Sequence, residues 1–315
     1  MELCEVRVPT YKRPRLLERA LKSLIAQDYC CWKAIVMDDS PAQEAKLIVD
    51  SLADDRIIYS PNSQNLGGAG NLDRAFASHS LVDGTYACVL EDDNWLLPNY
   101  LSENISSLKR RNVTLLLRNQ QIWTQTEHTS EPTGRTTRGD WFASKIYDPF
   151  ELHAHLFFFE TISNGGLFWK TSIKTQLQVG IQVSDAGLQE YCRALQIQDH
   201  LLFEPEPLCC WAEMPSNLSL RNPAANRVFG RGVQAIKMKL IQTSGSAIIQ
   251  QAEEIARDLN KLPEFEQSLV DALYISYSFK CINKVNALKQ YCKSYARYLF
   301  VKNPLQAHFE AKYTT

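Results

Sequence analysis

Several features that mark other protein classes are missing from this sequence. Its 315 residues contain 34 basic and 35 acidic side chains, so no basic excess favours nucleic acid as a partner. No apolar run reaches the roughly 20 residues that a membrane-spanning helix needs. The nine cysteines form no CxxC pair, and none lies near a spaced pair of histidines, which argues against a zinc site. The absence of a signal peptide at the start predicts a cytoplasmic protein with reduced, buried cysteines.

What the sequence does contain is the composition of an ordinary globular protein. Apolar residues make up 45% and charged residues 22%, and the length suffices for one large domain or two smaller ones. Over the first hundred residues, strand-like apolar runs alternate with helical patterns. The strand-like runs lie at 4–8, 32–39, 56–61 and 85–93, and the helical patterns lie at 13–28, 42–53 and 71–80. This alternation predicts a parallel sheet covered by helices, with its ligand site beyond the carboxyl ends of the strands.

The pattern changes after residue 102. A strand is predicted over 112–124, and a Gly-Gly turn leads into a second strand within 162–170. The Gly, Pro, Ser and Thr content of 125–141 predicts a mobile loop, which either closes over the site as a lid, with Arg135 and Arg138, or is simply solvated. A helix is predicted over 185–197. The stretch 231–302 is compatible with helix throughout, with a break near Pro263.

Three acidic residues, Glu91, Asp92 and Asp93, follow directly after one of the predicted strands. Like charges at the mouth of a buried strand repel one another unless a cation lies among them. Two such carboxylates can hold a hard divalent ion that keeps waters and phosphate oxygens as its other ligands. The alternative is a solvated acidic turn that caps the following helix.

Four segments carry linked motifs in the order VPTYKRPRLLERALKSLIAQDY, AIVMDDSP, NLGGAGNLDRAF and YACVLEDDNWLLPNYL. Together they resemble family 2 of the glycosyltransferases, which has the GT-A fold. The resemblance implies an α/β fold, with a Rossmann-like, mostly parallel sheet flanked by helices and a C-terminal helical extension. It implies a nucleotide-sugar-binding half at 1–101, an acceptor-binding half of the same domain at 102–220, and a helical region at 221–315.

The same resemblance implies an inverting transfer of a sugar from a nucleotide diphosphate donor to a hydroxyl acceptor, assisted by Mn²⁺ or Mg²⁺. Thr10 and Tyr11 fall where the family holds the nucleoside base, and Asp39, with Asp38, falls where a carboxylate accepts a hydrogen bond from it. A uracil or thymine N3–H suits such an acceptor, which favours a UDP- or dTDP-sugar. Asp93 falls at the metal position. The donor-binding positions are Pro9, Thr10, Tyr11, Arg13, Asp38, Asp39, Asn65, Gly67, Gly68, Asn71, Glu91, Asp92, Asn164, Gly165 and Gly166.

The chain also departs from the family pattern. Lys12 stands where many members have Asn, and Gly70 stands where Arg is common. A His of the family's later motif falls near Met214, and a thioether is a poor ligand for a hard ion. Metal binding would then rest mainly on Asp93, or Glu213 would take the place of the His.

An inverting transfer needs a general base beside the acceptor. The resemblance places this base at the start of a helix in the second half of the domain, where Asp185 and Glu190 are the candidates. A helix cap is the competing role for Asp185. An exposed helix face, with Arg193 at i+3, is the competing role for Glu190. The spacing leaves the choice open.

The stretch 280–302 carries six basic residues and no acidic one, interleaved with aromatic and aliphatic residues. A basic amphipathic helix of this kind lies on an anionic membrane, which would suit a lipid-linked acceptor at the cytoplasmic face. The alternatives are a helix packed on the catalytic domain and a homodimer contact. The acceptor is therefore expected to be a glycan, a lipid-linked molecule or a small molecule.

Two other functions compete with the glycosyltransferase. A nucleotide-sugar-binding protein of the same fold without turnover would explain the missing metal-binding His. A nucleotidylyltransferase is disfavoured, because VPTYKRP, which follows the first predicted strand, does not look like a Gly-rich phosphate loop.

Overall fold

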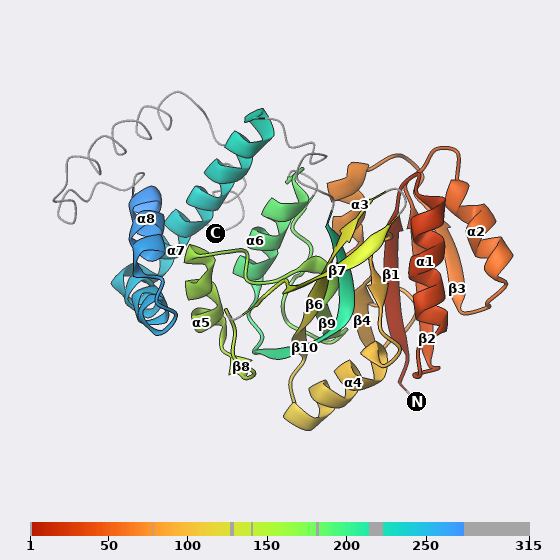
Figure 1. Cartoon of the computed structure of the whole chain (residues 1–315), viewed down its shortest axis with the longest axis horizontal. Helices are drawn as coiled ribbons and strands as arrows, with labels where there is room; N and C mark the ends of the chain where they lie inside the picture. Colours follow the sequence, from red (N-terminus) through yellow and green to blue (C-terminus); the bar gives the residue numbers. More distant parts are fainter. Residues whose placement is uncertain are drawn as a thin grey trace. The chain divides into compact units, whose positions relative to one another are not determined.

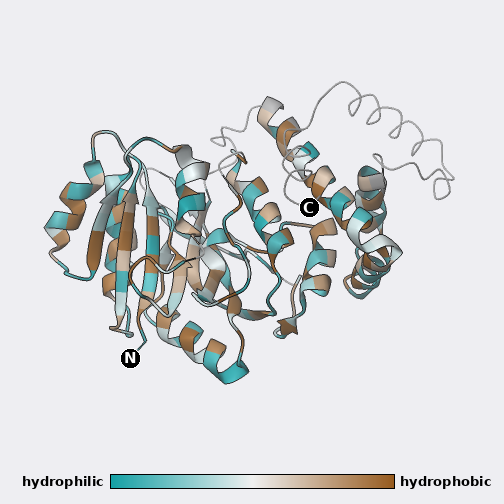
Figure 2. Cartoon of the chain, turned by 180° about the vertical axis from the view of Figure 1, so that it is seen from behind, coloured by the Kyte–Doolittle hydropathy of each residue, from teal (hydrophilic) through white to brown (hydrophobic). Residues whose placement is uncertain are grey.

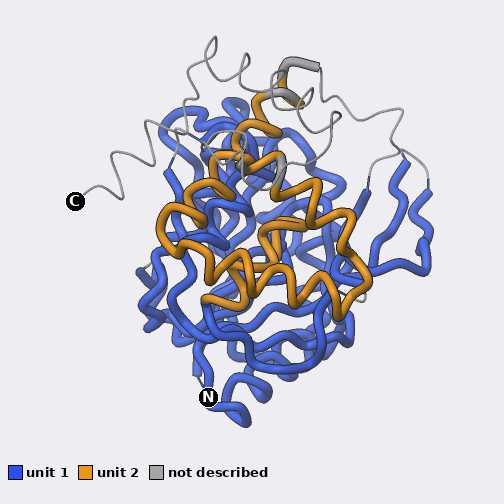
Figure 3. Tube along the Cα trace, turned by 90° about the vertical axis from the view of Figure 1, so that its left-hand side faces the viewer, with its two compact units in different colours: residues 1–149, 162–220 blue, residues 150–161, 221–315 orange. Residues whose placement is uncertain are grey.

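The computed structural model describes residues 2–77, 79–126, 129–139, 141–180, 183–213 and 223–273. The chain divides into two compact units, which are coloured separately in Figure 3. The first unit consists of 1–149 and 162–220, and the second of 150–161 and 221–315.

The described part of the first unit is built on a ten-stranded sheet with the order β3-β2-β1-β4-β9-β6-β10-β5, in which β7 pairs with β6 and β8 with β10 (Figure 1). Strands β3, β2, β1 and β4 are parallel neighbours, and β10 runs parallel to β6. Strand β9 is antiparallel to both β4 and β6. The bounds are β1 (Cys4–Thr10), β2 (Trp32–Asp38), β3 (Ile57–Pro61), β4 (Tyr86–Val89), β5 (Trp95–Leu96), β6 (Leu115–Gln125), β7 (Ser130–Thr136), β8 (Ile146–Tyr147), β9 (Leu167–Lys170) and β10 (Leu201–Glu213).

Helices cover this sheet because their apolar side chains recur every three or four residues. Helix α1 (Pro14–Ile25) begins with a proline at its first turn and buries Leu17, Leu21 and Leu24, each contributing about 1.5–3 kcal/mol. Strand β1 is buried along its whole length, as expected of a strand covered on both faces. Figure 2 shows hydrophobic and hydrophilic residues alternating around the helices. The other helices are α2 (Glu44–Leu52), α3 (Gly67–Ala75), α4 (Tyr100–Arg111) and α6 (Ala186–Gln196), with a short 3₁₀ turn η2 (Asn164–Gly166). The predicted α/β fold with a helix-flanked sheet is confirmed.

The segment predicted as a mobile loop contains strand β7. Strand β6 extends to Gln125, and β7 pairs with it in antiparallel register. The hydroxyl of Thr133 also donates to the Ile122 carbonyl at 2.8 Å. The loop prediction was wrong for 130–136 because composition was weighed without the edge of β6, which supplies hydrogen-bond partners to a Gly- and Thr-rich segment.

The second unit is helical in its described part. It contains α7 (Pro223–Asp258), α8 (Leu262–Leu273), the turn η1 (His155–Phe157) and all of α5 (Pro149–Ala154) except its first residue. Phe157 packs against Phe265 of α8, with ring centroids 6.0 Å apart. The predicted break near Pro263 is confirmed. None of the helices in the described ranges is long and apolar enough to cross a membrane. The basic stretch 280–302 and Met214 lie outside the described residues.

Candidate active site

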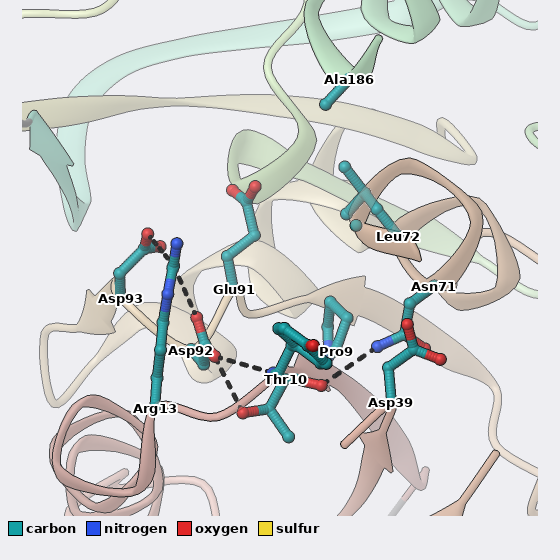
Figure 4. A pocket seen from close by; sticks show the side chains of 12 residues that line it. Pro9, Thr10, Arg13, Asp39, Asn71, Leu72, Glu91, Asp92, Asp93 and Ala186 are labelled. Atoms are coloured by element: carbon teal, nitrogen blue, oxygen red, sulfur yellow. Dashed lines mark hydrogen bonds and ion pairs between the residues drawn. The ribbon is translucent and has the colours of Figure 1, made fainter. Parts of the chain in front are cut away.

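A cavity of about 310 Å³ lies beyond the carboxyl ends of β1, β2 and β4 (Figure 4). The parallel register places Thr10 of β1 opposite Asp38 of β2, and the Asp39 N–H donates to the Thr10 carbonyl at 3.0 Å. The strand ends therefore meet at one edge of the sheet, as the alternation predicted. The cavity is lined by Pro9, Thr10, Tyr11, Arg13, Asp39, Gly68, Asn71, Leu72, Glu91, Asp92, Asp93 and Ala186.

Asp39 forms one wall of the cavity and is only 3% exposed. Its Oδ1 accepts hydrogen bonds from Asn62 Nδ2 and from the Leu66 N–H, both at 2.7 Å. Its Oδ2 is buried and accepts no hydrogen bond from any residue in the described part of the chain. A buried carboxylate oxygen without a donor is costly, so this wall suits a ligand that brings an N–H group.

Asp38, the neighbouring candidate, does not line the cavity. Its Oδ1 accepts from the Ser40 N–H at 2.9 Å, and its Oδ2 accepts from the Tyr59 hydroxyl at 2.9 Å. Because the side chain is 1% exposed and both oxygens are engaged by the protein, the structure assigns the cavity wall to Asp39 alone of this pair.

The first loop adopts a strained conformation at Lys12, whose φ is 54°. Asn adopts this left-handed region more readily than Lys does. The Lys12 N–H donates to Ser40 Oγ at 2.8 Å, and the Lys12 ammonium lies 5.0 Å from the centre of the Tyr11 ring. The loop thereby keeps Tyr11, which is 43% exposed, at the mouth of the cavity.

The acidic turn forms the other wall, and an arginine lies against it. Arg13 donates to Asp93 Oδ2 at 2.8 Å and to Asp92 Oδ1 at 3.3 Å. Asp92 Oδ2 also accepts from the Thr10 hydroxyl at 2.8 Å. The like charges expected at this strand end are thus partly compensated by a residue of the first loop.

Arg13 and Thr10 compensate the charge of the acidic turn only in part, as the raised pKa values of Glu91 and Asp92 show. Burial, together with the charges of Asp93 and Glu190, raises the pKa of Glu91 to about 8. Burial also raises the pKa of Asp92 to about 6, with Asp93 adding to the effect and Arg13 opposing it. The charged forms of Glu91 and Asp92 are therefore unfavourable in the chain without a ligand, and a cation at the turn would stabilise them.

The donor set fits a hard divalent ion that takes most of its ligands from elsewhere. No three His, Cys, Asp or Glu side chains within the described ranges come together as a metal-binding group. Asp92 and Asp93 both line the cavity and both pair with Arg13, but Asp93 is the more exposed, at 33%, and Asp92 also accepts from the Thr10 hydroxyl. Mg²⁺ or Mn²⁺ held by one carboxylate, phosphate oxygens and water is compatible with this arrangement.

The two candidate bases have different surroundings. Asp185 caps helix α6, because its Oδ1 accepts from the Leu188 N–H at 2.9 Å. Glu190, one turn further on, is half-buried, and its Oε1 accepts from the Asn164 N–H at 2.8 Å. Its charge also acts on Glu91 in the cavity wall. Glu190 therefore lies near Glu91 of the acidic turn, and Asp185 precedes Ala186, which lines the cavity.

Some of the predicted glycines lie at or near the cavity, whereas Gly166 is required for packing. Gly68 lines the cavity, and Gly67 has a φ of 73° that a side chain would strain. A Cβ at Gly165 would lie 3.5 Å from Glu91 Oε2, so this backbone comes close to the site. A Cβ at Gly166 would meet Ser163 and Arg118 at 2.5 and 2.6 Å, which makes that glycine a packing requirement.

Three residues that line the cavity or support its wall, Asn62, Leu72 and Ala186, were not predicted from the sequence. Asn62 follows the end of β3, so the strand-end argument that found Asp39 could have found it. Asn65, which was predicted at the donor, instead donates to the Asp39 carbonyl at 2.9 Å and does not line the cavity. Leu72 and Ala186 line the cavity with ordinary apolar side chains, and the sequence carries no signal for them.

Comparison with known proteins gives the class and then the family. The structure of Staphylococcus aureus TarS 1–349 in complex with UDP-GlcNAc aligns with 92% of this chain and 80% of its own length, with a TM-score of 0.57 at 14% identity. This likeness, together with the helix-flanked sheet and the cavity at its strand ends, defines a glycosyltransferase fold of the GT-A type. The family model of glycosyl transferase family 2 matches residues 5–160, and this part of the chain belongs to that family.

Two curated relatives are similar to part of this chain. One, from Campylobacter jejuni, is named GalNAc(5)-diNAcBac-PP-undecaprenol beta-1,3-glucosyltransferase and is 37% identical over 105 residues, which are 32% of this chain and 33% of that protein. The other, from Escherichia coli, is named UDP-Glc:alpha-D-GlcNAc-diphosphoundecaprenol beta-1,3-glucosyltransferase WfgD and is 25% identical over 120 residues, 38% of this chain and 46% of that protein. The aligned part is less than half the length of either relative.

Proposed function

We propose that this protein is an inverting glycosyltransferase that moves a sugar from a UDP- or dTDP-sugar to a hydroxyl group. The observation that carries the proposal is the pairing of two walls in one cavity. One wall holds the unpaired Oδ2 of Asp39, and the other holds the under-compensated acidic turn at Asp92 and Asp93. A pyrimidine nucleotide has complementary groups at its two ends: an N–H donor on the base and a diphosphate that brings a divalent ion.

The hydrogen-bonding groups of a pyrimidine explain why we place the nucleoside base of the donor at Asp39. Uracil and thymine carry an N3–H donor, which Asp39 Oδ2 can accept as a charge-assisted bond. Tyr11, exposed at the cavity mouth, offers a ring on which the base can stack. A nucleotide-binding half at 1–101 and an acceptor half at 102–220 follow as proposals, because every lining residue except Ala186 lies in the first segment.

The diphosphate end lies at Asp93 and Arg13. A Mg²⁺ or Mn²⁺ ion held by Asp93 would stabilise the negative charge that develops on the leaving diphosphate. Arg13 is 52% exposed at its side chain, so its guanidinium is free to move from the carboxylates toward a phosphate oxygen. Both groups then stabilise the same leaving group.

The chemical step requires a base on the acceptor side. Glu190 takes the proton of the acceptor hydroxyl, the acceptor oxygen forms a bond to the anomeric carbon, and the bond from that carbon to the diphosphate oxygen breaks. The electron pair leaves with the nucleotide diphosphate. The Asn164 N–H donates to Oε1 of Glu190 and so orients its carboxylate.

The names of the relatives narrow the substrates that deserve testing. The E. coli relative is named for UDP-Glc and a lipid diphosphate-linked GlcNAc, and the TarS complex contains UDP-GlcNAc. Both curated relatives are named for a β-1,3 product on undecaprenol-linked glycans. We therefore propose UDP-hexoses as donors and a glycan on a lipid diphosphate as the acceptor, reached by peripheral contact with a membrane.

The test is release of UDP from a panel of UDP-sugars with Mn²⁺, with and without lipid diphosphate-linked glycans. Turnover that depends on the acceptor and is lost in Asp93→Ala supports the proposal. UDP binding without release from any donor would instead identify a binding protein without turnover. The matched control is Asp50→Asn, an exposed carboxylate on α2 that pairs only with Lys46 among the described contacts.

A further inference from the structure

Helix α6 carries two buried polar side chains on the face that it turns toward α3. Gln189 and Arg193 are four residues apart, and each is 0% exposed. Gln189 Nε2 donates to the Ala69 carbonyl of α3 at 3.0 Å and to the Val183 carbonyl at 2.9 Å. The helix that carries the candidate base is therefore joined to the helix that begins with the Gly-rich donor loop.

Arg193 makes the more extensive connection. Its Nε donates to the Leu177 carbonyl at 2.8 Å, one terminal nitrogen donates to Asn164 Oδ1 at 2.6 Å, and the other pairs with Asp73 Oδ1 of α3 at 3.2 Å. The guanidinium also lies 3.6 Å from the centre of the Phe76 ring. One side chain thus fixes three separate segments, which only the planar fork of an arginine can do.

The carboxylate of Asp73 also accepts hydrogen bonds from backbone groups. It is 3% exposed, and its two oxygens accept from the Val179 N–H at 2.7 Å and from the Gly180 N–H at 2.8 Å. Its orientation is therefore set by backbone groups before Arg193 is considered. Asp73 holds Arg193 in one position rather than merely neutralising it.

The connection reaches the base through Asn164. The side chain of Asn164 accepts from Arg193, and the backbone N–H of the same residue donates to Glu190 Oε1 at 2.8 Å. Asn164 is 4% exposed and begins the tight turn η2, which Gly165 and Gly166 continue. Because both hydrogen bonds belong to one residue, the contact of the Asn164 side chain with Arg193 restricts the positions that its backbone N–H can take.

We propose that Arg193 is a positioning residue for the transfer reaction, which fixes Asn164 so that its N–H holds Glu190 in the orientation of a general base. The inference rests on the proposed function. Arg193 does not line the cavity; its hydrogen bonds reach Glu190 through Asn164, and its charge also acts on Glu190. A displacement of about 1 Å in a catalytic group can cost a factor of about 100 in rate, so this role has a measurable consequence.

A buried arginine of the sheet, Arg118 in β6, supplies the contrast. Arg118 is 3% exposed, donates to Asn104 Oδ1 at 2.8 Å and to the Glu206 carbonyl at 3.3 Å, and has no part in the cavity. Its replacement has the structural cost of a lost buried arginine without an effect on Glu190. Arg118→Lys is therefore the matched control for Arg193→Lys.

The experiment measures kcat, the KM for the UDP-sugar, UDP affinity and the thermal midpoint for the full chain and its variants. We expect Arg193→Lys to lower kcat about 100-fold while the donor KM and UDP affinity change less than about threefold. Arg118→Lys is expected to lower the thermal midpoint similarly and to leave kcat unchanged. Equal losses of kcat in the two variants, or a loss confined to donor KM, would overturn the positioning role.

A second variant keeps the proposal testable if Arg193→Lys folds poorly. Asn164→Ala retains the backbone N–H and removes only the acceptor for Arg193. We expect a lower kcat in this variant, and a double variant that is no slower than the worse single one, because both act through the same link. Additive losses would contradict the proposal. A wild-type chain that releases no UDP with any donor and acceptor overturns the proposed function, and this inference with it.

Discussion

Two acidic runs lie at the same edge of the sheet, and their surroundings differ. At the end of β2, Asp38 and Asp39 are held by uncharged donors: backbone N–H groups, an amide and a hydroxyl. At the end of β4, Asp92 and Asp93 share a guanidinium. The first run has a hydrogen-bond donor for every carboxylate oxygen except one, whereas the second adjoins Glu91 in a group of three carboxyls, two of which have raised pKa values.

This difference indicates what each run can bind. A single unpaired oxygen among hydrogen bonds selects a neutral group with one donor, such as the edge of a base. Crowded carboxylates with raised pKa values attract a charge, such as a metal ion with its phosphates. The two ends of a nucleotide donor thus correspond to two kinds of acidic cluster rather than to acidity as such.

The largest expected effect comes from Asp93, at the end of β4. Asp93→Asn removes the carboxylate proposed to hold the metal and to face the diphosphate, so we expect turnover to fall about 100- to 1,000-fold. Mn²⁺-dependent UDP release measures this loss. Mn²⁺ binding in the presence of UDP, followed by calorimetry, should weaken in parallel. Unchanged Mn²⁺ affinity in the variant would show that the metal is held elsewhere.

An intermediate effect is expected at Asp39, where uncharged groups surround the carboxylate. Asp39→Asn replaces a charge-assisted acceptor worth about 1.5–3 kcal/mol, so UDP affinity should fall about 10- to 100-fold with little change in kcat. The matched variant is Asp38→Asn, which loses contacts with Ser40 and Tyr59 outside the cavity. It should lower the thermal midpoint and leave UDP affinity as it is. Equal losses of UDP affinity in both variants would remove the distinction between them.

The smallest effect concerns the stability of the chain without metal or nucleotide. The folded-state pKa values of Glu91 and Asp92, about 8 and about 6, lie above their ordinary values, so the folded chain binds these protons more tightly than the unfolded chain does. Their contribution to stability is therefore largest at low pH and declines as the pH rises toward 8. Glu91→Gln should flatten this decline, as thermal midpoints measured in EDTA from pH 5 to 8 would show.

Glu5 provides the control of opposite sign. Burial raises the pKa of Glu5, but hydrogen bonds from Ser80, Val82, Leu81 and Gly84 outweigh it, so the net pKa is lowered. Glu5→Gln should therefore lose stability most clearly at neutral pH and least in acid. If Glu91→Gln and Glu5→Gln changed the pH dependence in the same direction, the assignment of raised pKa values to the β4 end would be wrong.

Much of the site could be predicted from local patterns. The alternation of strands and helices predicts parallel neighbours, and parallel neighbours bring Thr10, Asp39 and Asp93 to one edge whatever the details of packing. The strand at 130–136 could not be predicted, because its pairing depends on the edge of β6 rather than on its own composition. The choice between Asp185 and Glu190 was equally inaccessible, since both stand near the start of one helix.

The order of the elements, the edge where the ligand site lies and the acidic residues at that edge follow from the sequence alone, because they depend on periodicity and on the direction of parallel strands. The tertiary structure decided which oxygen of Asp39 remained unpaired, that Arg13 lies against the acidic turn, and which backbone N–H holds Glu190. Those outcomes depend on hydrogen bonds between residues distant in sequence, such as Asn62 with Asp39 and Asn164 with Glu190. Such partners are set by three-dimensional packing and leave no local pattern in the chain.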